Sequence, residues 1–270
     1  MNDLGTVLAK LKPIIEYCAN AEILPRFQRV SANVKSDGSI VTEADLAMQA
    51  RVKTALQSLW PEVGFVGEEM DAQDQQLQFN QSPHGVWILD PLDGTSNFAT
   101  GIDCFSVSLA LIKDSEVLLG LVYDPIRKEM FNAIKGKGAQ LNGQPLRVKP
   151  ISPPLQKTIG LIDFKRLTAE LAGRLVQHPP YASQRSFGSV ALDWCWIAAG
   201  RGHVYLHGKQ KLWDYAAGWL VLHEAGGYSC TLDAEAVYNG ELEPRSAVAA
   251  ADKSLFDEWC RWLNISGSSE

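Results

Sequence analysis

The amino-acid sequence predicts an α/β (α+β) fold in which helices and sheets form layers in two halves. Three observations support this prediction. Helical patterns fill most of the first 60 residues, a run of strand patterns begins at Val86, and strands alternate with helices beyond residue 155. Because each sheet and each amphipathic helix has to bury an apolar face against another element, this order favours stacked layers of both types.

The first 60 residues are expected to form helices interrupted by a polar loop from Ser31 to Ile40. In the helix after this loop, apolar residues recur at helical spacing and a proline follows the end. The apolar residues are Met48, Val52, Ala55, Leu56 and Leu59, and the proline is Pro61. Thr42 stands three residues before Asp45, which is the spacing of an N-terminal helix cap.

Strand patterns follow from Val86 onwards. The segment VWILD is expected to be a short buried strand that ends on Asp90. The segments FSVSLALI and SEVLLGLVY flank Lys113 and Asp114, which predicts a hairpin. A further strand, EMFNAI, and a Gly-rich turn come next.

Prolines near residues 150–155 predict the boundary between the halves. We expect residues 1–150 to form an N-terminal α+β half with the motif DPLDGT, and residues 151–270 to form a C-terminal α/β half with the motif WDYAAG. In the second half the strand patterns TIGLI, HVYL and AVAAA alternate with helices. These helices are expected to begin near Arg166, Ser189, Asp214 and Asp252.

Composition and charge argue against several classes of protein. The chain has 270 residues, 46% of them hydrophobic and 21% charged, which is typical of a globular protein. We expect a cytoplasmic protein, since no apolar run reaches the roughly 18–20 residues of a membrane span and the N-terminal residues lack a signal pattern. Five scattered cysteines argue against a disulfide framework or a thiolate zinc site. A net charge of −6 without a basic stripe argues against a nucleic-acid partner.

The most informative segment is WILDPLDGTSNF, residues 87–98. A strand is expected to end on Asp90, Pro91 to force a turn, and Asp93 to lie within a few ångströms of Asp90. Two carboxylates this close repel each other unless a cation lies between them. Mg²⁺ is held by a few carboxylates together with phosphate oxygens, and N–H groups at a turn bind phosphate. The alternative for either aspartate alone is a simple turn residue.

Further acidic residues stand where elements are expected to end or begin. Glu68 and Glu69 follow the apolar run VGFV, Asp45 lies at the start of a helix, and Asp214 opens another helix. Each has an alternative interpretation. Asp45 and Asp214 could serve only as helix caps, and the two glutamates could be solvated loop charges.

Taken together and in order, these motifs resemble the inositol monophosphatase family of metal-dependent, lithium-sensitive phosphatases. The resemblance covers nearly the whole chain. It is carried by the motifs VTEAD, GEE, DPLDGTSNF, RSFGSVAL and WDYAAG, with a closing EAGG. It implies a layered αβαβα fold of the sugar-phosphatase type with the site between the two halves, and it implies a homodimer.

The resemblance also implies roles for individual residues. The metal ligands would be Glu68, Asp90, Asp93, Asp214 and the backbone carbonyl of Leu92. Asp45 and Thr95 would position and deprotonate the attacking water. Gly94 and Thr95 would bind phosphate, and Gly188 and Ser189 would face the rest of the substrate. Lys35 would lie near the metals in the loop before Asp45.

The implied reaction is hydrolysis of a small-molecule phosphate ester with two or three Mg²⁺ ions. Phosphate monoesters hydrolyse extremely slowly unaided, and metal ions that activate a water make a covalent phosphoenzyme unnecessary. Haloacid-dehalogenase-type phosphatases form an aspartyl phosphate on a DxDGT motif. Here Asp90 and Asp93 stand one residue further apart, so that alternative does not fit.

The substrate is defined less well than the reaction. Inositol-preferring relatives have a glutamate seven residues before the aspartate of the WD motif, and this chain has His207 there. A histidine accepts one hydrogen bond or, when cationic, contacts a second anion, and Lys209 and Lys211 add charge nearby. The alternative for this segment is an ordinary surface loop.

We expect His207 to contact the substrate, and we expect the substrate to be inositol monophosphate or a related polyol or sugar phosphate. Fructose 1,6-bisphosphate, histidinol phosphate and a nucleotide 3′-phosphate are alternatives. An accessory role in transcription is an alternative of another class, because some relatives act with RNA polymerase. A protein can also keep its fold after it has lost its catalytic activity. The complete set of acidic residues favours an enzyme.

Overall fold

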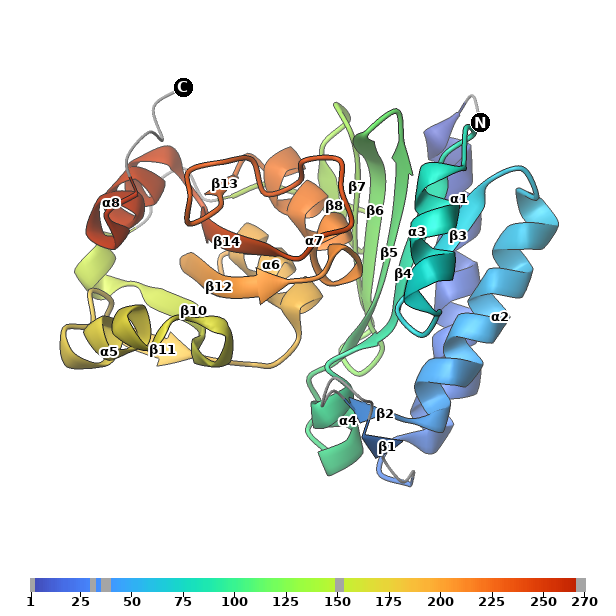
Figure 1. Ribbon diagram of the computed structural model, residues 1–270, viewed down its shortest axis with the longest axis horizontal. Helices are drawn as coiled ribbons and strands as arrows, with labels where there is room; N and C mark the ends of the chain where they lie inside the picture. The colour runs from blue at the N-terminus through green and yellow to red at the C-terminus, as the bar shows by residue number, and fades with distance from the viewer. Residues whose placement is uncertain (1–2, 30–32, 35–39, 149–152, 266–270) are drawn as a thin grey trace.

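Two β-sheets and the helices on their faces form five layers (Figure 1). The structure is a computed structural model, and it describes residues 3–29, 33–34, 40–148 and 153–265. Helices α1, α2 and α3 cover the outer face of the larger sheet, α6 and α7 lie between the sheets, and α5 and α8 lie beyond the smaller sheet. These helices span Leu4–Cys18, Glu43–Leu59, Ala72–Asn80, Val190–Ala198, Leu212–Glu224, Ala169–Gln177 and Lys253–Leu263, in the order named.

The larger sheet has seven strands in the order β3-β4-β5-β6-β7-β8-β9. Only the β3–β4 pair is parallel, and the other neighbours are antiparallel. The strands span Gly64–Gly67, Val86–Asp93, Ser106–Lys113, Glu116–Asp124, Glu129–Ile134, Ala139–Leu141 and Gln144–Leu146. The predicted hairpin at Lys113 and Asp114 is confirmed as the β5–β6 turn.

The smaller sheet has five strands in the order β11-β10-β12-β14-β13. These strands span Ser183–Arg185, Ile159–Asp163, Val204–Gln210, Arg245–Ala250 and Tyr228–Cys230. The strands β10, β11 and β12 are parallel, and β14 runs antiparallel to both of its neighbours. A two-stranded ribbon, β1 (Asn33–Val34) with β2 (Ile40–Val41), and a short helix, α4 (Thr95–Thr100), lie near one end of the larger sheet.

Short helical turns complete the described chain. A π-helical turn continues α1, and 3-10 turns precede the ribbon and flank β10. They span Ala19–Ile23, Leu24–Arg26, Leu155–Lys157 and Phe164–Arg166. None of the helices of the described residues combines the length and the apolar character that a membrane span needs.

The prediction that a strand ends on Asp90 is wrong, because β4 continues to Asp93. Pro91 has no N–H group for the ladder. The Asp90 side chain instead accepts a hydrogen bond from the Leu92 N–H at 2.9 Å, and pairing with β5 resumes after a register shift at Asp93. The motif is therefore a bulge within a strand rather than a turn after one.

The predicted helix starts in the second half agree with the structure to within a few residues. Ser189 and Asp252 are the N-caps of α6 and α8, and Asp214 lies in the first turn of α7. Near Arg166 the chain forms a 3-10 turn, and α5 begins only after Thr168, whose side chain caps it. The predicted boundary near residues 150–155 falls between the two sheets in the chain, and it stays a prediction.

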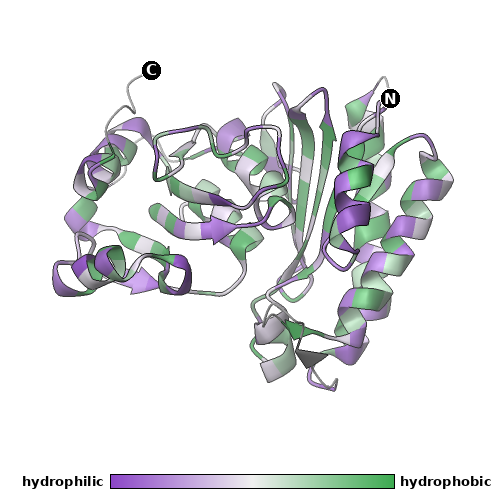
Figure 2. Cartoon of the chain, in the orientation of Figure 1, coloured by the Kyte–Doolittle hydropathy of each residue, from purple (hydrophilic) through white to green (hydrophobic). Residues whose placement is uncertain are grey.

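The helices between the sheets are buried on almost every side. Eight of the nine residues of α6 and nine residues of α7 are buried. A helix that is apolar all round fits such a central layer, whereas the outer helix α3 is mostly hydrophilic (Figure 2). Glycines allow the close approach: a Cβ on Gly120 of β6 would lie 2.6 Å from the Ala217 carbonyl oxygen of α7.

This close packing predicts that Gly120→Ala lowers the free energy of unfolding by about 1–3 kcal/mol, the usual cost of overpacking against rigid backbone. The matched control is Gly173→Ala in α5, where an added Cβ meets nothing within 4 Å. That change should raise the free energy of unfolding by about 0.5–1 kcal/mol. Urea denaturation of both variants checks the prediction, and equal stability of Gly120→Ala and wild type would refute it.

Candidate active site

Three carboxylates from three separate elements meet beside the larger sheet. Glu68 follows β3, Asp90 lies in β4, and Asp214 lies in the first turn of α7. One oxygen of each lies within 4.8 Å of the others. Asp90 is buried, whereas Glu68 and Asp214 are partly exposed, so the cluster opens to solvent on one side.

Backbone contacts bring these carboxylates together. The Glu68 N–H donates to the Leu89 carbonyl at 3.0 Å, which extends the parallel β3–β4 pairing up to Asp90. Ser108 stands opposite Asp90 on β5, and its hydroxyl donates to the Trp213 carbonyl at 2.8 Å. That bond ties the first turn of α7 to the sheet, so that Asp214 reaches the cluster.

The electrostatics of the cluster are unfavourable without a cation. Burial, followed by the charges of Glu68, Asp93 and Asp214, raises the pKa of Asp90 well above its ordinary value. Burial and the charges of Glu68 and Asp93 raise the pKa of Asp214 in the same way. Three hard oxygen ligands that repel each other are a suitable donor set for a divalent cation such as Mg²⁺.

The carboxylate of Asp93 is turned away from this group. Its Oδ1 accepts from the Val190 N–H at 3.1 Å, and its Oδ2 accepts from the Ser189 hydroxyl at 2.5 Å and the Ala191 N–H at 2.8 Å. Burial nevertheless raises the pKa of Asp93 to about 6. The structure therefore places Asp93 at the N-terminus of α6, and its predicted role as a metal ligand stays a prediction.

Asp45 and Thr95 lie together, as the predicted water-activating pair requires. Asp45 Oδ2 accepts from the Thr42 N–H at 2.8 Å and from its hydroxyl at 2.6 Å, so Asp45 belongs to a capping box at the start of α2. The Thr95 hydroxyl lies 3.0 Å from Asp45 Oδ1 and 2.9 Å from the Leu92 carbonyl oxygen. Burial raises the pKa of Asp45, although the hydrogen bonds from Thr42 and Thr95 oppose this shift.

The two predicted glycines lie side by side. Gly94 has a φ of +96° and Gly188 a φ of +76°, and a Cβ on Gly94 would lie 3.2 Å from the Gly188 carbonyl oxygen. The Asn97 side chain joins the two segments by donating to the carbonyls of Cys104 at 2.7 Å and Phe187 at 2.6 Å. The motifs DPLDGTSNF and RSFGSVAL therefore form one continuous surface beside the carboxylates.

His207 is buried in the middle of β12, and contacts occupy both ring nitrogens. Nδ1 accepts from the Lys209 N–H at 3.1 Å, and Nε2 lies 3.0 Å from Oδ2 of Asp163. In this arrangement the ring offers no free nitrogen to a ligand. Lys35, predicted to lie near the metals, is outside the described residues.

Sequence reasoning did not single out Asp163 or Asp193. Asp163 is the last residue of β10. Asp193 lies in α6, and its Oδ1 has no hydrogen-bond partner in the described part of the chain. Burial, then the charges of Asp93 and Asp163, raises the pKa of Asp193 well above its ordinary value. The sequence contained a signal that could have identified Asp163, because the strand pattern IGLID ends on an aspartate in the same way as VWILD.

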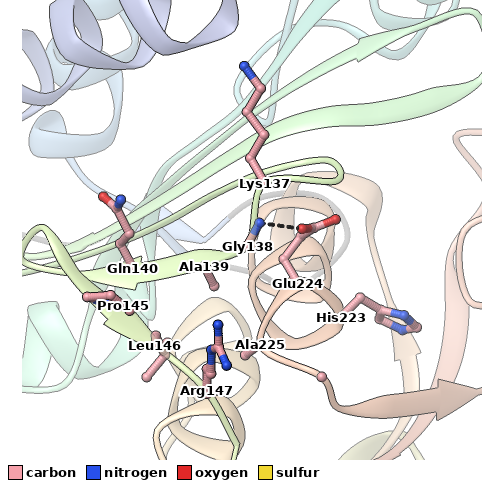
Figure 3. Close-up of a pocket in the computed structure, with 11 residues that line it drawn as sticks. Lys137, Gly138, Ala139, Gln140, Pro145, Leu146, Arg147, His223, Glu224 and Ala225 are labelled. Carbon is pink, nitrogen blue, oxygen red and sulfur yellow. Dashed lines mark hydrogen bonds between the residues drawn. The ribbon is translucent and has the colours of Figure 1, made fainter.

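A cavity of about 520 Å³ lies away from these residues, between the β7–β8 turn, β9 and the end of α7 (Figure 3). Glu224 projects into its wall, where its two carboxylate oxygens accept from the N–H groups of Gly136 and Gly138, both at 2.7 Å. Burial lowers the pKa of His223 to about 4, so this ring is neutral. None of the predicted site residues lines this cavity.

Comparisons with known proteins identify the family and the fold. The model of the inositol monophosphatase family matches residues 12–265. The Nus factor SuhB of Haemophilus influenzae is 36% identical over 238 residues, 85% of each chain. Inositol monophosphatase 1 of Solanum lycopersicum is 37% identical over 199 residues, 72% of each chain.

A solved structure gives the same result for the fold. The IMPase of Thermotoga maritima matches with a TM-score of 0.83 at 26% identity, over 96% of this chain and 97% of that one. The predicted layered α/β fold is thereby confirmed. Since the family match spans both sheets and every motif of the site, the chain belongs to the inositol monophosphatase family.

Proposed function

We propose that the chain is a Mg²⁺-dependent phosphomonoesterase that acts on inositol monophosphate or a related polyol phosphate. The observation that carries this proposal is the cluster of Glu68, Asp90 and Asp214, whose carboxylate oxygens lie within 4.8 Å of one another. Membership of a phosphatase family supports the reaction. The name of the tomato relative supports the choice of inositol phosphates.

The donor set fits Mg²⁺, because this ion prefers oxygen ligands and is bound through a few carboxylates and substrate phosphate oxygens. We assign Glu68, Asp90 and Asp214 as ligands. Asp93 and the Leu92 carbonyl are further proposed ligands for a site of two or three ions. When bound, the ions supply positive charge that lowers the pKa of a water and neutralises the phosphate.

The protein groups of the mechanism position the reactants and move one proton. The Thr95 hydroxyl lies between Asp45 and the Leu92 carbonyl, so it is placed to accept the proton of an attacking water while it passes its own to Asp45. Because burial raises the pKa of Asp45, this carboxylate is a stronger base than an exposed aspartate. The backbone N–H groups at Gly94 and Thr95 would hold the phosphate.

Several relatives carry the name Nus factor SuhB, which describes those proteins. For this chain the complete set of acids favours catalysis, and an accessory role would be additional to it. Fructose 1,6-bisphosphate, histidinol phosphate and nucleotide 3′-phosphates remain alternative substrates.

The proposal predicts that phosphate release from inositol 1-phosphate requires a divalent cation, because the clustered acids otherwise repel one another and cannot polarise phosphate. Release should be maximal with millimolar Mg²⁺, absent in excess EDTA, and restored when Mg²⁺ is added back. Millimolar Li⁺ should inhibit, as family membership leads us to expect. Full turnover in EDTA would rule out the proposed mechanism.

A second prediction concerns Asp90, the buried member of the cluster. Asp90→Asn should lower kcat by at least about 10³-fold, since a charged ligand is lost where negative charge develops during the reaction. The fold should persist, because the substitution removes repulsion among buried acids; a thermal melt provides this control. If the folded variant kept more than about a tenth of the wild-type kcat, the assignment of Asp90 would be wrong.

A further inference from the structure

The carboxyl end of β10 lies beside β12, the strand that leads into the helix of the carboxylate cluster. The two strands are parallel neighbours, and Asp163, the last residue of β10, is paired with His207, after which β12 continues to Gln210. After β12 the chain passes directly into α7, whose first turn carries Asp214. Clefts at the carboxyl ends of parallel strands are common ligand sites. Asp163 is therefore joined through His207 and β12 to the helix that carries Asp214.

Hydrogen bonding defines the state of this pair. Because Nδ1 of His207 accepts from the Lys209 N–H, the proton of the neutral ring is on Nε2, which lies 3.0 Å from Asp163. The His207 side chain is 5% exposed and the Asp163 side chain 29%. The group that the pair offers to solvent is therefore the carboxylate.

A second hydrogen bond, from the backbone after β10, fixes the position of the Asp163 carboxylate. Its Oδ1 accepts from the Lys165 N–H at 2.8 Å. The turn Phe164–Arg166 lies directly on β12, because a Cβ on Gly208 would be 1.8 Å from the Arg166 carbonyl oxygen. A carboxylate accepts about four hydrogen bonds, and two are used here, so both oxygens keep a free position.

The charge of Asp163 is maintained by these contacts. Burial alone would raise its pKa, but the hydrogen bond from His207, the Lys165 N–H and the Arg166 charge together lower the pKa below its ordinary value. Asp163 is thus an ionised and well-ordered acceptor at neutral pH.

Helix α6 links this acceptor to the reaction centre. Its first turn donates to Asp93 and also carries Asp193, which is close enough to both Asp93 and Asp163 to be influenced by their charges. Asp193 is 6% exposed, and its Oδ1 has no partner in the part of the chain that the structure describes. Unpaired buried oxygens are unfavourable unless a ligand or water supplies the missing hydrogen bond.

We propose that Asp163, positioned by His207, is a specificity-determining residue that accepts hydrogen bonds from hydroxyl groups on the alcohol part of the substrate. This inference rests on the proposed function and deepens it. A polyol phosphate gains hydrogen bonds to a charged acceptor, whereas a substrate with a second phosphate at this position is repelled. His207 acts through Asp163 and does not itself contact a second anion.

The test compares kcat/KM for inositol 1-phosphate, fructose 1,6-bisphosphate and phenyl phosphate, which has no hydroxyl groups. A hydrogen bond to a charged group corresponds to roughly 10- to 150-fold in kcat/KM. Asp163→Asn should therefore lower the inositol 1-phosphate to phenyl phosphate ratio by at least about tenfold, mainly through KM. The fructose 1,6-bisphosphate to phenyl phosphate ratio should rise.

The matched control is Asp257→Asn on α8. Asp257 has similar exposure, 36%, and a cationic partner, Lys253, at 2.6 Å, so the same charge is removed on the far side of the smaller sheet. For Asp257→Asn, both ratios should stay within twofold of the wild-type values.

His207→Gln, whose amide nitrogen can replace Nε2, should retain most of the preference for inositol 1-phosphate. His207→Leu should behave like Asp163→Asn.

The outcomes separate this inference from the proposed function. If wild type releases phosphate with Mg²⁺ but Asp163→Asn changes the ratios by less than twofold, the role of Asp163 is refuted and the phosphatase assignment stands. A fall in the fructose 1,6-bisphosphate to phenyl phosphate ratio in Asp163→Asn would also refute the role of Asp163. If wild type releases no phosphate from any of the three esters, both proposals fail.

Discussion

The mutual repulsion of Glu68, Asp90 and Asp214 is the constraint on which the rest of the structure depends. A parallel strand pair, a bulged strand and the first turn of a buried helix bring the three carboxylates together, and burial with the neighbouring acidic charges raises the pKa of Asp90 and of Asp214. The packing of α7 on β6, which requires glycine at position 120, supplies the rigidity that keeps them there. A cation between these carboxylates would relieve their repulsion.

Much of this architecture could be predicted from the sequence, because its signals are local. Strand alternation and helix caps are properties of a few neighbouring residues, and they place Asp45 and Asp214 in the first turns of their helices, whereas Asp90 lies within β4 and not at its predicted end. The orientation of Asp93 could not be predicted in this way. Its partners, Ser189, Val190 and Ala191, come nearly 100 residues later and compete with a metal for the same oxygens.

The pairing of His207 with Asp163 also depends on residues that lie far apart in the sequence. As a single residue in the sequence, His207 suggested a cationic contact to a second anion. In the fold, β10 and β12 are neighbours, and the ring becomes the support of an acidic side chain. Register between distant strands is a tertiary property, so the contact between His207 and Asp163 was not visible in the sequence.

The central claim, that a cation relieves repulsion within the cluster, is tested most directly by melting temperatures of wild type and Asp90→Asn at pH 6 and pH 8. Groups with a raised folded pKa contribute stability that is lost as pH rises. In EDTA, the melting temperature of wild type should therefore fall more between pH 6 and pH 8 than that of Asp90→Asn. Addition of Mg²⁺ at pH 8 should restore the melting temperature of wild type. Identical pH profiles for the two proteins, with no gain from Mg²⁺, would contradict the account.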